Sequence, residues 1–413
     1  MSKITGYWKR HLRPLFFNAV RRFGGVPVPR ESTTAADYED RSRACVVTEL
    51  PHAHEAIPPR LVVGHVDELE NTKALIPDPL AYARYERGLL GADLHRSDEC
   101  VAVIDGGRVT HDAGVVITPD SCIVADVSGL AADSDLPTNP LRLRFLAPPR
   151  RRTGSVAIVT CTMPYNYYHW LIEALPRLAL YERAGIRADR FYAPVDDKFQ
   201  RQSLRLLGID PGRVEPATAN RHVVADTLVA SSLRRDATRW KTDFLHHRLT
   251  RGLDAASAPS LRVFVSRRHR GKRTLTNDDA VFRALKPLGF RRFDLESLSV
   301  AEQIRLFFDA ACVVAPHGAG LTNIVFCRPG TKVVEINTPY RINVTCFYWI
   351  AHYRRLDYRL HVARPVRDRF FHFDPASAGG DSDLWVDPEE FAASVAAVLE
   401  AVPVRPAVVR RAA

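Results

Sequence analysis

A regular alternation of short apolar runs with helical segments, between residues 261 and 362, constrains the fold of this chain more than any other feature. The runs are four or five residues long, which is the length of a buried strand, and helical segments separate them. The expected strands are Leu261–Val265, Phe290–Phe293, Cys312–Ala315, Lys332–Ile336 and Tyr358–Val362, and the expected helices are Asp278–Leu288, Val300–Ala311, Leu321–Cys327 and 342–353. Strands that alternate with helices form a parallel sheet, so this region predicts a Rossmann-like α/β domain.

The preceding part of the chain shows a similar alternation after a lead-in of short β-like pieces. Residues 30–150 are rich in proline, and turn signals such as Asp105-Gly106-Gly107 separate the β-like runs. The elements expected after this lead-in are strands at Val156–Cys161 and Phe191–Pro194 and helices at Tyr168–Ala184 and Lys198–Leu207. They predict a second βαβ arrangement.

Shifts in composition suggest where the parts of the chain begin and end. The basic stretch Pro148–Arg152 is interpreted as a linker, and Ala255–Pro259 as an interdomain linker. Near the C-terminus, Asp387 as N-cap and Pro388 at the first helical position predict a final helix. The expected parts are 1–30, a basic amphipathic segment; 31–255, an N-terminal domain; 256–386, the Rossmann-like domain; and 387–413, the final helix and tail.

Composition narrows the class of protein. With 413 residues, 46% hydrophobic and 25% charged, the chain is typical of globular proteins, which excludes wholesale disorder. A net charge of +11 favours anionic partners: nucleic acid, phospholipid head groups or nucleotide phosphates. The seven cysteines show no CxxC spacing and predict neither a disulfide framework nor a structural zinc site, so a reducing cytoplasm fits best. Because no apolar stretch reaches 18 residues, we expect neither a membrane span nor export.

The first thirty residues differ from the rest. Residues 8–23 mix basic and large apolar side chains at helical spacing, which predicts a cationic amphipathic helix on an anionic membrane surface. The alternative is a helix that packs on the protein's own body, and Pro14 interrupts either helix.

Two loops after expected strands carry groups that suit a diphosphate. His317-Gly318-Ala319-Gly320 lies between a strand and a helix, where glycines permit close approach of a phosphate to the backbone and a helix N-terminus attracts anions. Asn323 stands where the dinucleotide fingerprint has its third glycine, so the alternative is an ordinary strand-to-helix turn. Arg267 and Arg273 belong to a basic loop after the strand that ends at Val265.

Because carboxyl ends of parallel strands share one edge of the sheet, we expect these two loops to converge, with Arg267 or Arg273 on a pyrophosphate. The alternative is that the basic run is only a solvated loop. Glu335, near the end of the next strand, is placed to accept hydrogen bonds from ribose hydroxyls or to cap a neighbouring helix.

In the N-terminal half, His169 and Glu173 lie four residues apart and share a face of the expected helix. A helix N-terminus disfavours the protonated form of a histidine, which suits a general base. The alternative is a structural histidine. Metal binding has less support, because His52-Ala53-His54, His246-His247 and Asp381-Ser382-Asp383 belong to no recognisable ligand set.

These residues resemble glycosyltransferase family 61, which includes bacterial capsular-polysaccharide-type transferases, plant xylosyl- and arabinosyltransferases and animal N-acetylglucosaminyltransferases acting on proteins. The resemblance covers about 150–365 and has its motifs in order. They are Tyr-Tyr-His-Trp-Leu-Ile-Glu-Ala-Leu-Pro-Arg-Leu (167–178), Ser-Arg-Arg (266–268) with Arg273 and Asn277 downstream, Ala-Glu-Gln (301–303), Pro-His-Gly-Ala-Gly-Leu-Thr-Asn (316–323) and Val-Val-Glu-Ile (333–336).

The resemblance implies a GT-B architecture, in which two Rossmann-like domains face a cleft, here preceded by the β-containing lead-in. It implies an inverting transferase (hexosyl- or pentosyltransferase) with no required metal or other cofactor, which moves a sugar from a UDP-sugar to a hydroxyl of a glycan or lipid-linked glycan acceptor. Residues 31–255 would form the acceptor side and 256–386 the nucleotide-sugar side, with the final helix crossing back to the N-terminal domain. A role in capsular or surface polysaccharide biosynthesis fits a cytoplasmic protein, peripheral at the inner face of the cytoplasmic membrane.

The resemblance also implies roles for single residues. His169 is the expected base and Glu173 the second choice, and the family pattern does not decide between them. The expected nucleotide-sugar-binding residues are Arg267, Arg273, Asn277, His317, Gly318, Ala319, Gly320, Asn323 and Glu335. A nucleotide-sugar-binding protein without catalysis would not need His169 and Glu173. A nucleic-acid-binding protein would explain the charge, but the basic residues are spread along the chain, so no nucleic-acid partner is expected.

Overall fold

The computed structural model describes residues 26–27, 32–42, 44–50, 99–129, 145–268, 273–338, 345–366 and 383–401. The chain divides into two compact units: a first unit of Met1–Glu55 and Arg96–Arg235, and a second unit of Ala56–His95 and Asp236–Ala413. Both contain helices and a sheet with parallel strands, so the fold class is mixed α/β, as predicted.

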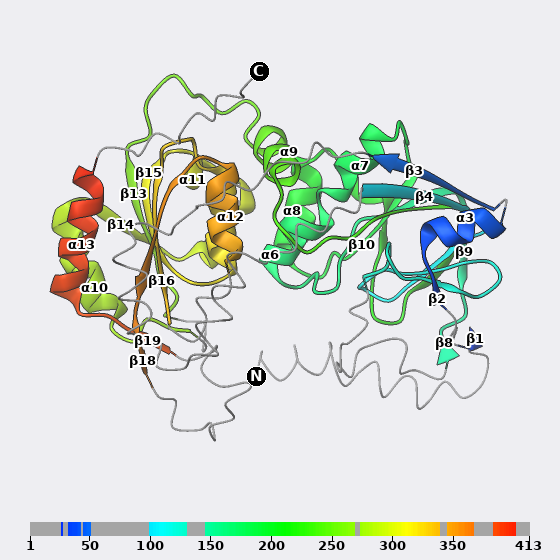
Figure 1. Ribbon diagram of the computed structural model, residues 1–413, viewed down its shortest axis with the longest axis horizontal. Coiled ribbons are helices and arrows are strands. Elements are labelled where there is room, and N and C mark those ends of the chain that lie inside the picture. Colours follow the sequence, from blue (N-terminus) through cyan, green and yellow to red (C-terminus); the bar gives the residue numbers. More distant parts are fainter. Residues whose placement is uncertain are drawn as a thin grey trace, which may run out of the picture. The chain divides into compact units, whose positions relative to one another are not determined.

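The described part of the second unit contains a five-stranded parallel sheet (Figure 1). Its strands are β13 (Leu261–Val265), β14 (Phe290–Phe293), β15 (Ala310–Pro316), β16 (Lys332–Asn337) and β17 (Asp357–Val362), in the spatial order β14-β13-β15-β16-β17. All five predicted strands are confirmed. The order reverses direction between β13 and β15, and in open parallel sheets the crevice beyond the carboxyl ends of strands at such a point is where ligands bind.

Helices cover both faces of this sheet. They are α9 (Arg239–Leu249), α10 (Asp278–Leu285), α11 (Val300–Phe308), α12 (Cys346–Tyr353) and α13 (Pro388–Glu400), with 3₁₀ segments η5 (Lys286–Leu288), η6 (Leu295–Ser297) and η7 (Ala319–Phe326). Figure 1 shows α10 and α13 on one face and α11 and α12 on the other. β18 (Arg364–Val366) pairs antiparallel with β19 (Asp383–Trp385).

Helix α13 belongs to the second unit, so the expectation that the final helix crosses to the N-terminal domain was wrong. Asp387 caps it as predicted, accepting hydrogen bonds from two backbone N–H groups of the first turn. Phe391 and Val395 are buried in a core that also contains Phe264 and Leu285. The Lys332 ammonium donates to the carbonyls of the last turn, which are otherwise without a helical partner.

The first unit is built on a ten-stranded mixed sheet, counted over its described residues. Its strands are β2 (Ser32–Thr33), β3 (Cys45–Leu50), β4 (Glu99–Asp105), β5 (Arg108–Thr110), β6 (Val115–Ile117), β7 (Ile123–Val124), β9 (Arg150–Ile158), β10 (Arg190–Ala193), β11 (Val214–Pro216) and β12 (His222–Ser231), and a separate pair joins β1 (Val26–Pro27) to β8 (Phe145–Leu146). β11, β10, β9 and β12 run parallel, and β12 then pairs antiparallel with β5 and β4. The lead-in before residue 150 is therefore β-containing, as predicted.

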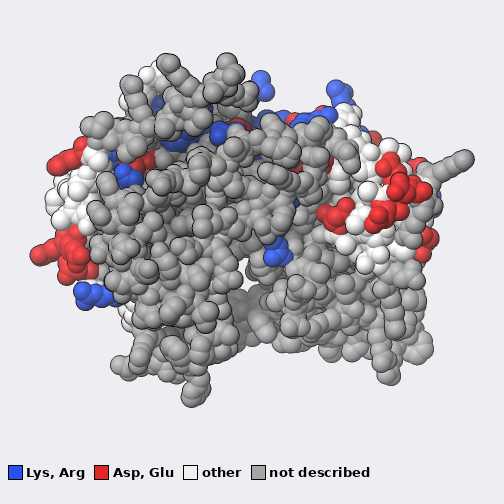
Figure 2. Space-filling model, in the orientation of Figure 1, with Lys and Arg blue, Asp and Glu red and all other residues white. Residues whose placement is uncertain are grey.

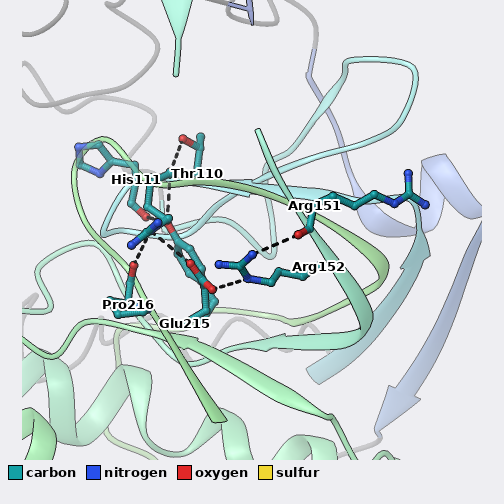
Figure 3. Close-up of polar contacts among 8 residues, drawn as sticks. Thr110, His111, Arg151, Arg152, Glu215 and Pro216 are labelled. Carbon is teal, nitrogen blue, oxygen red and sulfur yellow. Dashed lines mark hydrogen bonds and ion pairs between the residues drawn. The ribbon is translucent and has the colours of Figure 1, made fainter. Parts of the chain in front are cut away.

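The basic stretch Pro148–Arg152 is not a linker. Arg150, Arg151 and Arg152 begin β9 and pair with β12. Arg152 Nε donates to Glu215 Oε2 on β11 at 2.6 Å (Figure 3). The buried Glu215 carboxylate needs a hydrogen-bond donor and a counter-charge, and Arg152 supplies both. This ion pair anchors the charged start of β9 to β11.

The first unit's helical segments are α3 (Ala35–Arg41), α6 (Tyr167–His169), the π segment η3 (Trp170–Ala174), α7 (Arg177–Arg183), α8 (Lys198–Leu206) and the 3₁₀ segment η4 (Pro211–Arg213). The single helix predicted at Tyr168–Ala184 is thus broken into three pieces. Pro176 is the physical reason, because proline has no N–H to donate and its ring displaces the carbonyl of the preceding turn.

Charges of both signs lie on the surface. Figure 2 shows acidic side chains gathered on the first unit, over the position of α3 in Figure 1, so this face is not uniformly basic. Among the helices that the structure describes, none has the length and hydropathy needed to cross a bilayer. Residues 8–23, His52, His54, the loop 269–272 and Asp381 lie outside the described residues.

Candidate functional site

In the second unit, the start of the basic loop lies against the glycine turn with which it was predicted to converge. An ideal Cβ placed on Gly318 would stand 1.7 Å from Nη1 of Arg267, so the guanidinium lies directly against the Gly318 backbone. Arg267 follows β13 and Gly318 follows β15, which are the two strands on either side of the reversal in strand order. The structure therefore places a cation and a glycine turn together, at the edge of the sheet where ligands bind in this class of fold.

His317 lies beside this contact and is buried. Its Nδ1 pairs with Glu335 Oε1 on β16, and the Tyr358 hydroxyl of β17 donates to Glu335 Oε2. Asn337 Nδ2 lies 3.2 Å from Glu335 Oε1 and 3.3 Å from His317 Nδ1. The Phe347 ring packs edge-on against the imidazole, with 5.0 Å between ring centroids. His317 and Glu335 were predicted separately, and the structure joins them in one buried network.

The remaining predicted nucleotide-side residues support the loops in different ways. Asn277 donates from Nδ2 to the Val386 carbonyl at 2.7 Å, which ties the start of α10 to the segment before α13. Asn323 is buried and donates to Gln303 Oε1 and to the Gly320 carbonyl, both at 2.9 Å, so it closes the turn. Arg273 is half-buried and adopts a left-handed conformation with φ of 53°. Ala319 and Gly320 open η7.

In the first unit, His169 and Glu173 form a pair, as their spacing predicted. Asn166 caps the segment by accepting from the Tyr168 N–H at 2.9 Å, and His169 lies in the first turn. His169 Nδ1 pairs with Glu173 Oε1. The imidazole is 18% exposed and the carboxylate is fully buried. Only the histidine of this pair can therefore reach a substrate without a rearrangement.

The π segment places this pair on irregular backbone. The Leu175 N–H donates to the Trp170 carbonyl, five residues back, at 3.1 Å. Such segments are rare and occur often at functional sites. Nearby, burial raises the pKa of the Cys161 thiol well above its ordinary value, and the Glu173 carboxylate adds to this rise, so Cys161 stays neutral.

Arg177 is a residue whose importance the sequence analysis missed. It is buried, and its guanidinium donates to the carbonyls of Thr160, Val127 and Ser231 and to the Ser231 hydroxyl, at 2.8–3.1 Å. These groups lie at the carboxyl ends of β9 and β12 and in the loop after β7. An arginine within the apolar stretch Leu175–Leu180 was the available signal.

Within the described residues, no group of three or more His, Cys, Asp or Glu side chains is placed to hold a metal ion. Asp383, one of the acids considered for a metal, accepts from the Thr274 N–H at 2.7 Å and so joins β19 to the start of the α10 region.

Residues 167–334 match the model of the family described as Glycosyltransferase 61. The resemblance based on the motifs is therefore confirmed over this stretch, which contains all the predicted site residues except Glu335.

A segment of 62 residues is 40% identical to a protein of Oryza sativa subsp. japonica described as a beta-1,2-xylosyltransferase. The segment is 15% of this chain and 11% of the rice protein, so this similarity is local. Together, the family match and this relative support a glycosyltransferase.

Proposed function

We propose that this protein is an inverting glycosyltransferase that moves a sugar from a UDP-sugar to a hydroxyl group of a glycan or lipid-linked glycan acceptor. The observation that carries the proposal is the family match over residues 167–334, because the matched region includes both the Arg267–Gly318 contact and the His169–Glu173 pair. The division of labour follows the GT-B pattern: the second unit binds the donor and the first unit activates the acceptor.

On the donor side, Arg267 and the turn at Gly318 bind the diphosphate, and Arg273 adds a second positive charge. Arginine suits this role because its guanidinium can bind two phosphate oxygens at once. The buried hydroxyl of Thr338, directly after β16, has no hydrogen-bond partner in the described structure, and such an atom favours a site that a polar ligand completes. Asn277, Asn323 and Glu335 act by holding these loops in place.

On the acceptor side, His169 is the general base and Glu173 orients it. The Glu173 carboxylate binds Nδ1, so Nδ1 carries the proton and Nε2 accepts one from the acceptor hydroxyl. The acceptor oxygen then bonds to the anomeric carbon, the carbon–oxygen bond to the diphosphate breaks, and its electron pair leaves with UDP. Arg267 stabilises the negative charge that develops on UDP. The proposed reaction needs no metal.

The biological setting proposed is surface or capsular polysaccharide biosynthesis at the inner face of the cytoplasmic membrane, with residues 1–30 in reversible contact with anionic lipid. The net charge of +11 favours such contact. Co-sedimentation of the full chain with anionic vesicles tests this part, and equal binding to neutral vesicles contradicts it.

The decisive experiment compares the wild type with His169→Ala and Glu173→Gln, using a panel of UDP-sugars with and without EDTA. We expect one UDP-sugar to be turned over in the presence of EDTA. Loss of the base should lower kcat by about two to four orders of magnitude and leave UDP affinity within about twofold. Glu173→Gln should cause a smaller loss of kcat.

A third variant, His247→Ala, changes an exposed histidine of α9 and controls for nonspecific loss of activity. UDP binding without turnover of any sugar would favour a nucleotide-sugar-binding protein. Absence of UDP binding would contradict the proposed function altogether.

A further inference from the structure

Glu335 lies too deep to serve a ribose in the way its position in the sequence suggested. Glu335 is 1% exposed, and its carboxyl group accepts from Asn337 Nδ2 and the Tyr358 hydroxyl and pairs with His317 Nδ1. Val334 and Ile336 point into the core beneath α10 and α13, so Glu335, between them on β16, points to the opposite face of the sheet. The carboxylate is therefore part of the protein's interior.

Two donors besides His317 face the carboxyl group: Asn337 Nδ2 lies on Oε1 and the Tyr358 hydroxyl on Oε2. A buried carboxylate needs donors on both oxygens, and here Oε1 and Oε2 each have one or more. The ring nitrogen that faces it must then carry a proton. The Asn337 side-chain amide donates to Glu335 Oε1, with 3.2 Å between Nδ2 and Oε1. Asn337 therefore does not need His317 Nδ1 as an acceptor.

We propose that Glu335 is a positioning residue for His317: it fixes the imidazole with Nδ1–H on the carboxylate and balances a positive charge on the ring, so that Nε2–H binds the diphosphate of the donor. This inference rests on the proposed function and deepens it. His317 immediately precedes Gly318, whose backbone touches the Arg267 guanidinium. The imidazolium thus adds a cation from the loop after β15 to the two arginines, Arg267 and Arg273, of the loop after β13.

In the reaction, His317 transfers no proton. The bond from the anomeric carbon to the diphosphate breaks, its electron pair stays on the diphosphate oxygen, and the imidazolium stabilises that charge through a hydrogen bond. The proton of the acceptor hydroxyl goes to His169. Glu335 touches neither the sugar nor the nucleotide, so its effect must be read through His317.

The test distinguishes contacts to the diphosphate from contacts to the ribose, because uridine lacks the diphosphate that UDP carries. Calorimetry measures the affinity of each variant for both ligands. If Glu335 orients His317, Glu335→Gln should weaken UDP binding about ten- to hundredfold, the loss of one charge-assisted hydrogen bond, and leave uridine binding within about twofold. If Glu335 instead binds ribose, uridine and UDP should weaken by the same factor, which overturns the proposal.

Two further variants sharpen the comparison. Tyr358→Phe removes the donor on Oε2 and keeps the bond from His317 to Oε1, so UDP affinity should fall by less than about threefold; a loss equal to that of Glu335→Gln overturns the proposal. Adding Glu335→Gln to His317→Ala should cause no further loss of UDP affinity, because a residue that acts through His317 has no effect without it. An additive loss overturns it.

A measurement on the wild type tests the proposal even if the Glu335→Gln protein fails to fold. With ¹⁵N-labelled histidine, the ring signals of His317 are identified by their disappearance in His317→Gln, and both Nδ1 and Nε2 should carry a proton. A ring protonated at only one of the two nitrogens overturns the proposal. If the wild type binds neither uridine nor UDP, the proposed function fails; if it binds both and Glu335→Gln changes neither, only this inference fails.

Discussion

Gly318 is the residue at which the candidate donor site tolerates least change. Its conformation is extended, with φ of 161°, so the backbone itself does not require glycine. The requirement comes from space, because a Cβ would overlap the Arg267 guanidinium at 1.7 Å. The atom in the way is the far end of a long side chain, which can move without disturbing the fold.

Gly318→Ala should therefore keep the fold and displace the cation. We expect UDP affinity to fall about ten- to hundredfold, because a charge-assisted contact is lost, while the melting temperature stays within a few degrees. Gly212→Ala is the matched control, since its Cβ would meet the Asp210 carboxylate at ordinary distances of 3.5 Å and 3.9 Å. Calorimetry and thermal melting decide; unchanged UDP affinity in Gly318→Ala would place the diphosphate elsewhere.

The two histidine–glutamate pairs show which side-chain contacts can be predicted from the sequence and which cannot. His169 and Glu173 are four residues apart on one helical stretch, so helical periodicity alone predicts their contact. His317 directly follows β15, whereas Glu335 lies on β16. Their contact depends on the register of β15 and β16, where Ala315 lies opposite Glu335, and no local pattern specifies that register.

At the scale of elements, Arg177 connects the broken helical segment to the sheet. It follows the π segment and Pro176, and its guanidinium binds three carbonyls and one hydroxyl. The carbonyls come from parts of the chain as distant as residues 127 and 231. This single side chain therefore fixes α7, and with it the segment that carries His169, against the ends of two strands.

Replacing Arg177 by methionine should destabilise the protein by about 3–5 kcal/mol, because several buried carbonyls lose their donors. Arg177→Lys should recover only part of the loss, since one ammonium cannot span the same acceptors. Arg183→Met, at an exposed position in the last turn of α7, should stay within about 0.5 kcal/mol of the wild type. Urea unfolding measures all three, and equal stabilities of the Arg177 and Arg183 variants would refute this role.

The strands and helices of the second unit were predictable because each strand is a short, continuous apolar run and the segments between the strands have the 3.6-residue periodicity of helices. The start of β9 was not, because three arginines look like a solvated linker. In the structure these residues pair with β12 alone, and β10 joins only from Val156 onward. The exposed edge leaves room for charge. Likewise, the core in which α13 packs contains residues from 264 to 395. The position of α13 therefore could not be predicted from the sequence of the helix and its neighbours alone.

At the scale of the whole molecule, both units bury histidines that remain neutral. In the first unit, burial lowers the pKa of His222, whose Nδ1 lies 2.7 Å from the Ala147 carbonyl. In the second, burial lowers the pKa of His361 and, more strongly, that of His246 to about 4. His246 binds the Val325 carbonyl through Nδ1, which joins α9 to η7. In an unfolded chain a histidine titrates near 6.5, so acid favours the unfolded state of both units.

Acid destabilisation should therefore depend measurably on His246. Its folded pKa lies below its unfolded value, so its contribution to stability is complete above about pH 6.5 and is lost as the pH falls toward 4, by an amount on the order of 3 kcal/mol. His246→Gln keeps a donor for the Val325 carbonyl and removes the titration. Its unfolding free energy should be lower than that of the wild type at pH 7.5, and the two should converge as the pH falls to 4.5. His247→Gln, at the exposed neighbouring position, should keep the pH dependence of the wild type. Urea unfolding across this range tests the assignment: a His246→Gln protein with the full acid sensitivity of the wild type would show that other groups control the loss.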